Sequence, residues 1–123
     1  MESLIGELAR RIAAPPALQW LQASLGNTLR LVNVDDVMYF QSDTKYTRAV
    51  TPASESLIRK SIKELLEELD PESFWQIHRS TIVNVAAIAG VSRDFAGRLT
   101  VKLKSRKETL PVSQPFAHRF RQM

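Results

Sequence analysis

Alternation of apolar and polar residues is the commonest pattern along this chain, and it predicts a mainly β structure. The clearest case covers residues 98–104, where every second residue is Leu or Val and the others are Arg, Thr or Lys. Shorter runs bounded by turn residues predict further strands at 18–23, 28–33, 38–41, 46–51 and 108–112. Residues 94–97, which end in Gly, predict the turn of a hairpin that leads into the 98–104 strand.

Two other stretches carry apolar residues at helical spacing. In residues 2–14 these residues recur at positions 4, 5, 8 and 12, and a Pro-Pro pair ends the run. This helix is either an interdomain linker or a first helix packed on the domain. In residues 61–70, Ser61 and Glu64 form a capping box, and Pro71 stops the helix.

A last short helix is predicted near the C-terminus. Ser113 can cap it with its hydroxyl group, and Pro115 is tolerated in the first turn. Phe116 and Phe120 are four residues apart, so they bury the same side of this helix.

Residues 74–84 place His78, Arg79 and Ser80 between two apolar runs. This pattern predicts a strand and its exit turn, with core positions at Phe74, Ile77, Ile82 and Val83. Arg79 would then be held near the surface by buried neighbours. Its guanidinium group suits phosphate oxygens or the O6/N7 edge of guanine.

Composition narrows the chemistry. The 123 residues predict one domain, and the absence of cysteine excludes disulfides and thiolate metal sites. His78 and His118 alone do not make a zinc site, so neither a metal nor a cofactor is expected. No apolar run has the length of a membrane span and no signal-peptide pattern opens the chain, so a cytoplasmic location and no membrane partner are expected.

The net charge of +4 is unevenly distributed. Residues 61–73 carry a net charge of −4, whereas residues 74–123 carry a net charge of +7. A basic half that contains the Arg79 stretch favours a polyanionic partner such as nucleic acid over a merely solvated basic surface.

Three pieces of sequence follow one another in a distinctive order. They are residues 37–41 before the Lys45-Tyr46 turn, the Phe74-x-x-x-His-Arg-Ser-x-x-x-Asn84 motif with an apolar step at Ile88, and residues 110–113. In this order they resemble the LytTR DNA-binding domain. The resemblance covers roughly residues 25 to 123. It implies an elongated stack of antiparallel sheets with one or two short helices, formed by residues 17–123 after a linker helix at 1–16.

The resemblance also implies a function. It is sequence-specific binding of double-stranded DNA by the output domain of a two-component response regulator, which regulates transcription from promoter direct repeats through loops that enter successive major grooves. A receiver or sensor domain would lie outside this sequence, and a homodimer on the DNA is compatible with this role.

The family pattern carries over to individual residues. The first loop supplies Lys45, Tyr46 and Thr47, the second Arg79, and the third Gln114. The family often has a basic residue just after the serine, where this chain has Gln114-Pro115, so Arg119 or Arg121 is an alternative source of charge. The remaining candidates are two phosphate contacts and four supporting residues: Lys102 and Lys104, and His78, Ser80, Asn84 and Ser113.

Other functions are weaker on these residues. An enzyme that used His78 with Ser80 or Asp94 would need an oxyanion site, and no nucleophile elbow, metal motif or phosphate loop accompanies them. We therefore expect no catalytic activity. A protein-interaction module and an RNA-binding module without base-specific readout stay open, although the aromatic signature of an RNA-recognition motif is missing.

Overall fold

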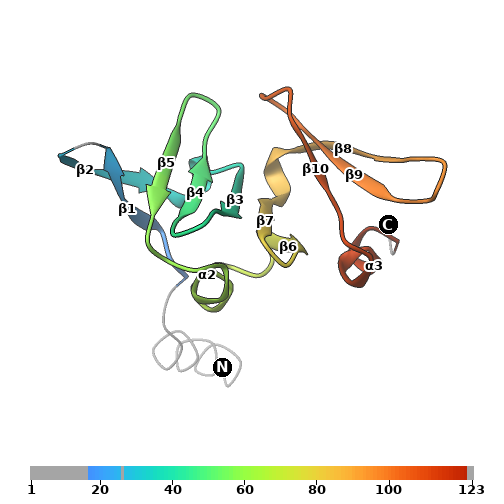
Figure 1. Ribbon diagram of the computed structural model, residues 1–123, viewed down its shortest axis with the longest axis horizontal. Coiled ribbons are helices and arrows are strands. Elements are labelled where there is room, and N and C mark those ends of the chain that lie inside the picture. Colours follow the sequence, from blue (N-terminus) through green and yellow to red (C-terminus); the bar gives the residue numbers. More distant parts are fainter. Residues whose placement is uncertain (1–16, 26, 122–123) are drawn as a thin grey trace, which may run out of the picture.

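The computed structural model describes residues 17–25 and 27–121, and the helix predicted at 2–14 lies outside this part of the chain. Within it, ten strands form two antiparallel sheets that follow one another along the long axis of the molecule (Figure 1). The mainly β prediction is therefore confirmed.

The larger sheet has seven strands in the order β2-β1-β5-β4-β3-β7-β6. These strands are β1 (Trp20–Leu25), β2 (Thr28–Asn33), β3 (Tyr39–Ser42), β4 (Thr47–Val50), β5 (Glu55–Ile58), β6 (Phe74–His78) and β7 (Thr81–Asn84). The smaller sheet has the order β10-β9-β8 and contains β8 (Ile88–Arg93), β9 (Leu99–Leu103) and β10 (Thr109–Pro111). The helices are α2 (Ile62–Glu68) and α3 (His118–Arg121), with short 3-10 turns η1 (Val34–Asp36), η2 (Val85–Ala87) and η3 (Gln114–Phe116).

Strand β5 was not predicted, and its burial explains why. Ser56 and Ile58 are buried in this strand, whereas Glu55 and Leu57 are exposed. A buried serine and an exposed leucine remove the apolar alternation that marks a half-buried strand. The strand forms because its backbone pairs with all four residues of β4.

The 74–84 stretch is a hairpin, which corrects the expectation of a single strand with an exit turn. β6 and β7 pair antiparallel from Phe74 opposite Asn84 to His78 opposite Thr81, and Arg79 and Ser80 form the turn between them. The predicted core residues Phe74, Ile77, Ile82 and Val83 are all buried. The pattern identified the buried positions correctly, but the chain reverses at the polar triplet.

Two cores lie on opposite faces of the larger sheet. Phe40 and Ile82 pack on one face with Leu65 of α2, whose N-terminus is capped by a 3.1 Å hydrogen bond from the Glu64 amide to Ser61 Oγ. On the other face, Tyr39 packs in a cluster with residues of the smaller sheet, such as Val101 and Leu110. The larger sheet is therefore covered on both sides at its centre.

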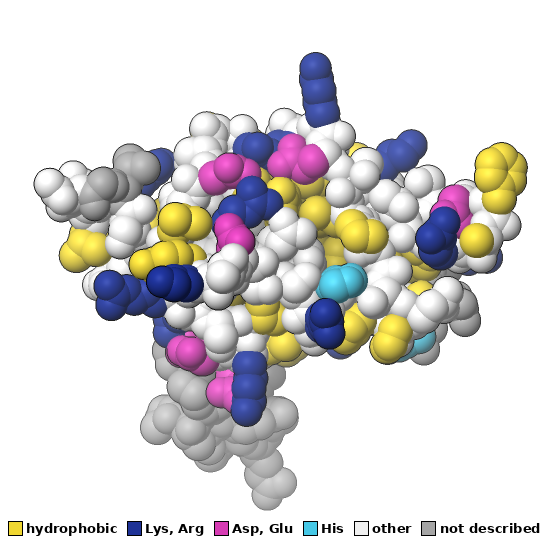
Figure 2. Space-filling model, in the orientation of Figure 1, with side chains coloured by type: hydrophobic (Ala, Val, Ile, Leu, Met, Phe, Trp, Pro, Cys, Tyr) yellow, Lys and Arg dark blue, Asp and Glu magenta, His cyan; other side chains and the backbone are white. Residues whose placement is uncertain are grey.

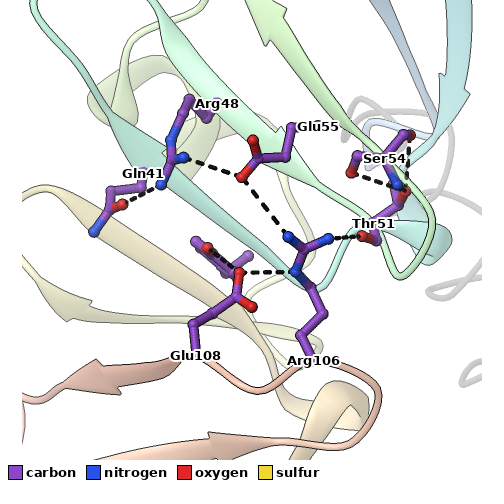
Figure 3. Close-up of polar contacts among 8 residues, drawn as sticks. Gln41, Arg48, Thr51, Ser54, Glu55, Arg106 and Glu108 are labelled. Atoms are coloured by element: carbon purple, nitrogen blue, oxygen red, sulfur yellow. Dashed lines mark hydrogen bonds and ion pairs between the residues drawn. The ribbon is translucent and has the colours of Figure 1, made fainter.

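A polar network connects the two sheets above this second core (Figure 3). The Tyr39 hydroxyl donates to Glu108 Oε2 at 2.9 Å, and Arg106 Nε donates to the same oxygen at 2.7 Å. Arg106 Nη1 also donates to the carbonyl of Thr51 at 3.0 Å. Burial and the hydrogen bond to Glu108 raise the pKa of Tyr39 to about 12. Hydrogen bonds therefore hold the loop before β10 against the ends of the larger sheet.

Tyr39→Phe should lower the free energy of unfolding by about 1–2 kcal/mol, because it removes a partly buried hydrogen bond to a carboxylate. The raised pKa of Tyr39, about 12 in the folded protein, against about 10 in the unfolded chain, also sets a pH window. The contribution of Tyr39 is fully present below pH 10 and is lost as the pH rises towards 12. Urea unfolding of both proteins across this range should show the difference in stability shrinking with pH, and a difference that stays constant would contradict this assignment.

Candidate nucleic-acid interface

Backbone hydrogen bonds bring three predicted contact segments together at one end of the larger sheet. The Ser42 amide, at the end of β3, donates to the carbonyl of Ser80 at 2.8 Å. The Ser113 amide, after β10, donates to the carbonyl of Ile77 at 2.8 Å. The β3–β4 turn, the β6–β7 turn and the start of η3 are therefore neighbours. We call the four predicted contact residues that are exposed on these segments the turn row: Lys45, Tyr46, Arg79 and Gln114.

The β3–β4 turn presents Lys45 and Tyr46 to solvent. The Asp43 amide closes it by donating to the Tyr46 carbonyl at 2.7 Å. Thr47, in contrast, is buried, and its hydroxyl donates to the Lys60 carbonyl at 2.6 Å. Of the first-loop candidates, the structure therefore places two on the surface and Thr47 inside, where it joins this turn to the end of β5.

Arg79 is at the apex of the β6–β7 turn and is exposed. On either side of it, His78 and Ser80 contact each other: the Ser80 amide donates to His78 Nδ1 at 3.2 Å, and Ser80 Oγ lies 2.9 Å from the same nitrogen. Among the residues that the structure describes, the Arg79 side chain has no ion-pair or hydrogen-bond partner. A short braced turn thus presents an uncompensated guanidinium group.

The contact between His78 and Ser80 belongs to this turn and does not extend into a triad. Asp94, the candidate third member, accepts hydrogen bonds from Ala96 and Arg98 within its own turn. The described residues contain no group of three or more His, Asp or Glu side chains that could hold a metal ion. No helix in that part of the chain is long and apolar enough to cross a membrane.

Asn84 is at the opposite end of β7 from the Arg79 turn and is buried. Its Nδ2 donates to the Val37 carbonyl at 2.9 Å, and its Oδ1 accepts from the Ala86 amide at 3.0 Å. Asn84 therefore connects the start of β3 to η2 and can affect the turn row only through the position of these strands.

Ser113 occupies the N-cap position of η3, but its hydroxyl makes no capping hydrogen bond, which corrects the predicted cap. Its backbone bonds to Ile77, as described above, and accepts from the Phe116 amide at 2.9 Å. The helix that follows is held by aromatic packing. The Phe120 ring lies edge-on to Trp75 of β6 at 5.7 Å, and the Arg119 guanidinium lies 5.6 Å from the Trp75 ring centroid.

Lys102 is exposed on the outer face of β9, and Lys104 is exposed directly after this strand. The beginning of β9 adjoins the turn row, because the Val112 amide donates to the Leu99 carbonyl at 3.0 Å. Lys104 is at the other end, where its amide donates to the Ala87 carbonyl at 3.0 Å. Five residues of strand span about 17 Å. The structure therefore does not bring Lys104 to the turn row.

One exposed basic residue at this end of the larger sheet was missed. Arg59 directly follows β5, next to Lys60, whose carbonyl binds Thr47. Since β5 itself was not predicted, no sequence signal placed Arg59 beside the Lys45-Tyr46 turn. Figure 2 shows basic side chains along the whole length of one face, over both sheets, with acidic side chains in smaller groups among them.

Comparisons with known proteins agree with this fold. The family model of the LytTr DNA-binding domain matches residues 27–123. The solved structure of a LytTr DNA-binding domain from Bacillus cereus superposes with a TM-score of 0.78 at 26% identity, covering 86% of this chain and 96% of that one.

Two curated relatives are similar over most of this chain. An uncharacterized response regulatory protein of Vibrio cholerae is 40% identical over 119 residues, which are 94% of this chain and 45% of the relative. The CO-responsive transcriptional regulator RcoM of Rhodospirillum rubrum is 30% identical over 111 residues, or 90% and 47% of the two chains. The chain thus spans less than half the length of these relatives.

Asn84→Ala should lower the free energy of unfolding by about 2–3 kcal/mol, because it leaves a buried carbonyl and an amide without partners. Chemical denaturation at neutral pH measures this loss. Gln22→Ala, on the exposed face of β1, is the control and should change stability by less than about 0.5 kcal/mol. Equal effects of the two substitutions would show that Asn84 does not hold the strand ends together.

Proposed function

The chain belongs to the LytTR family of DNA-binding domains, and on this premise we propose that it recognises specific sequences in double-stranded DNA through the turn row. The observation that supports this best is Arg79, exposed and unpaired within the described chain and braced by the contact between His78 and Ser80. A major groove about 12 Å wide admits a hairpin turn. Arg79 would donate both ends of its guanidinium group to O6 and N7 of a guanine.

The other members of the turn row have distinct roles in this proposal. Lys45 lies on the neighbouring turn, where an ammonium group can neutralise a phosphate or bind a guanine. The carboxamide of Gln114 can bind N6 and N7 of an adenine. Because backbone hydrogen bonds connect the three segments, they would meet the DNA as one rigid surface and lose little conformational entropy on binding.

We further propose that this domain is the output part of a transcriptional regulator in the cytoplasm. The relatives are named as a response regulatory protein and a transcriptional regulator, and both are more than twice as long as the matched region. A receiver or sensor domain elsewhere in a longer chain would control access to promoter direct repeats. Two copies bound to such repeats would form a homodimer on the DNA.

Arg79→Ala should weaken binding to a duplex that the wild-type protein has selected from a random library by about 1–3 kcal/mol. It should weaken binding to a scrambled duplex much less. Arg79→Lys should restore only part of the loss, because an ammonium group cannot form the bidentate pair. Anisotropy titrations at one salt concentration measure these affinities. Equal losses on the two duplexes would make Arg79 a phosphate contact, and a large fall in melting temperature would make it a structural residue.

The Lys102→Ala/Lys104→Ala double variant is the charge control. It removes two positive charges, one on the outer face of β9 and one directly after this strand, and neither residue belongs to the turn row. Phosphate contacts carry no sequence information, so affinity should fall by the same factor on both duplexes. If both side chains reach phosphates, the slope of log affinity against log salt should also fall by roughly 2. A selective loss on the specific duplex would show that the proposed turn row does not account for base recognition.

A further inference from the structure

The tip of the β8–β9 hairpin, residues 93–98, is a turn closed by several hydrogen bonds. Asp94 Oδ1 accepts hydrogen bonds from the amides of Ala96 at 3.0 Å and Arg98 at 2.9 Å, and Asp94 Oδ2 accepts from Arg98 Nε at 3.0 Å. Gly97 allows the reversal with a φ of 81°. These hydrogen bonds, the backbone one from Arg98 above all, hold the pKa of Asp94 below its usual range. The chain is thus fixed around a single carboxylate.

Phe95 at the apex of this turn has nothing to pack against. Its relative exposure is 112%, whereas the next most exposed large apolar side chain in the described residues, Leu29, reaches 72%. Covering an exposed aromatic ring with a binding partner removes apolar surface from water and therefore favours binding. A turn that is fixed by several hydrogen bonds and presents a fully exposed phenyl ring is suited to bind another molecule.

The charge around Phe95 favours an anionic partner. Arg93, the last residue of β8, and Arg98, just before β9, flank it, and both are exposed. Phe120 of α3 and Leu99 line a hollow of ≈ 290 Å³ beside Arg93, so the helix that carries Arg119 packs under the hairpin. Asp94 is the one acidic residue in the tip, and it is already paired with Arg98.

The hairpin tip continues the turn row. Leu99, the first residue of β9, binds Val112, and the next residue, Ser113, binds Ile77 of β6. Leu99 is opposite Arg93 at the turn end of the hairpin, so the segment that carries Gln114 lies close to the tip, which Figure 1 shows at one end of the molecule. DNA that lay along the turn row would pass the hairpin tip on the side of Gln114.

We propose that the hairpin tip is a fourth DNA contact, a wing that binds the duplex beyond the base pairs read by Gln114. Arg93 would bind a phosphate, while Arg98 stays paired with Asp94 and holds the turn, and the Phe95 ring would pack against the sugars and base edges of the minor groove. This proposal rests on the proposed function. It adds a contact that extends the footprint on one side only, because the described structure has this hairpin at one end of the molecule.

The test uses Phe95→Ala and three forms of the selected duplex: with about ten extra base pairs, roughly one helical turn, on both sides, and trimmed on either side alone. On the fully flanked duplex we expect affinity to fall about 5- to 20-fold, as for the loss of one aromatic contact to nucleic acid. On one of the two trimmed duplexes the variant and the wild type should bind alike. Arg93→Ala should repeat this one-sided pattern more weakly.

Two controls distinguish loss of the wing contact from a general loss of DNA affinity. Leu29→Ala removes an apolar and exposed side chain from β2 and should bind every duplex as the wild type does. Arg79→Ala should weaken binding on all three duplexes, because its contact lies inside the site. All variants change exposed residues, so melting temperatures should stay within about 2 °C of the wild type.

Three outcomes would overturn the wing. Phe95→Ala could leave affinity unchanged on the flanked duplex while Arg79→Ala weakens it, which would leave the proposed function standing. A change in self-association by sedimentation, with no change in DNA affinity, would assign the tip to a protein partner. Absence of DNA binding by the wild type would remove both proposals. A one-sided, flank-dependent loss supports the wing.

Discussion

The fold depends on burying both faces of the larger sheet at its centre. Tyr39 and Phe40 are consecutive in β3 and point to opposite faces, yet both are buried. Helix α2 buries one face and the smaller sheet buries the other, so the fold requires both layers. Packing these layers together also buries polar groups, which need hydrogen-bond partners. Between the two sheets, Tyr39, Glu108 and Arg106 supply these partners to one another.

This packing decides where the contact segments lie. Because the smaller sheet covers the Tyr39 face, the end of β10 arrives beside the end of β6, and Ser113 binds Ile77 there. The same end of the sheet carries the β3–β4 turn, which Ser42 ties to Ser80. Residues far apart in the chain thus form one row, and the described residues contain neither a group of three or more potential metal ligands nor a cysteine. The arrangement would position charges with the rigidity of a sheet rather than of free loops.

Ion pairing with carboxylates, and not only the number of basic residues, determines which of them are free to contact DNA. Arg48, Lys60, Arg98 and Arg106 each lie within 4.0 Å of a carboxylate. Arg79 has no such neighbour in the described chain. A high net charge draws any cationic protein towards DNA, but an unpaired guanidinium group on a braced turn can discriminate between bases. The proposed specificity therefore rests on a few positions within a generally basic half.

The sequence by itself determined the mainly β class, the α2 helix with its Ser61 cap, the core positions of β6 and β7, and the family motif around His78, Arg79 and Ser80. The β class, the helix and the core positions depend on local periodicity and capping, which act over a few residues, whereas the motif was identified by its resemblance to the LytTR family. Only the tertiary structure decided that 74–84 reverses into a hairpin, that β5 is a strand, that Thr47 is buried, and that Lys104 lies away from the turn row. It also decided that Ser113 acts through its backbone. One physical reason explains all of them. Strand pairing and the hydrogen bonds at strand ends join residues that are distant in the chain, and the local sequence pattern does not specify which distant segments pair.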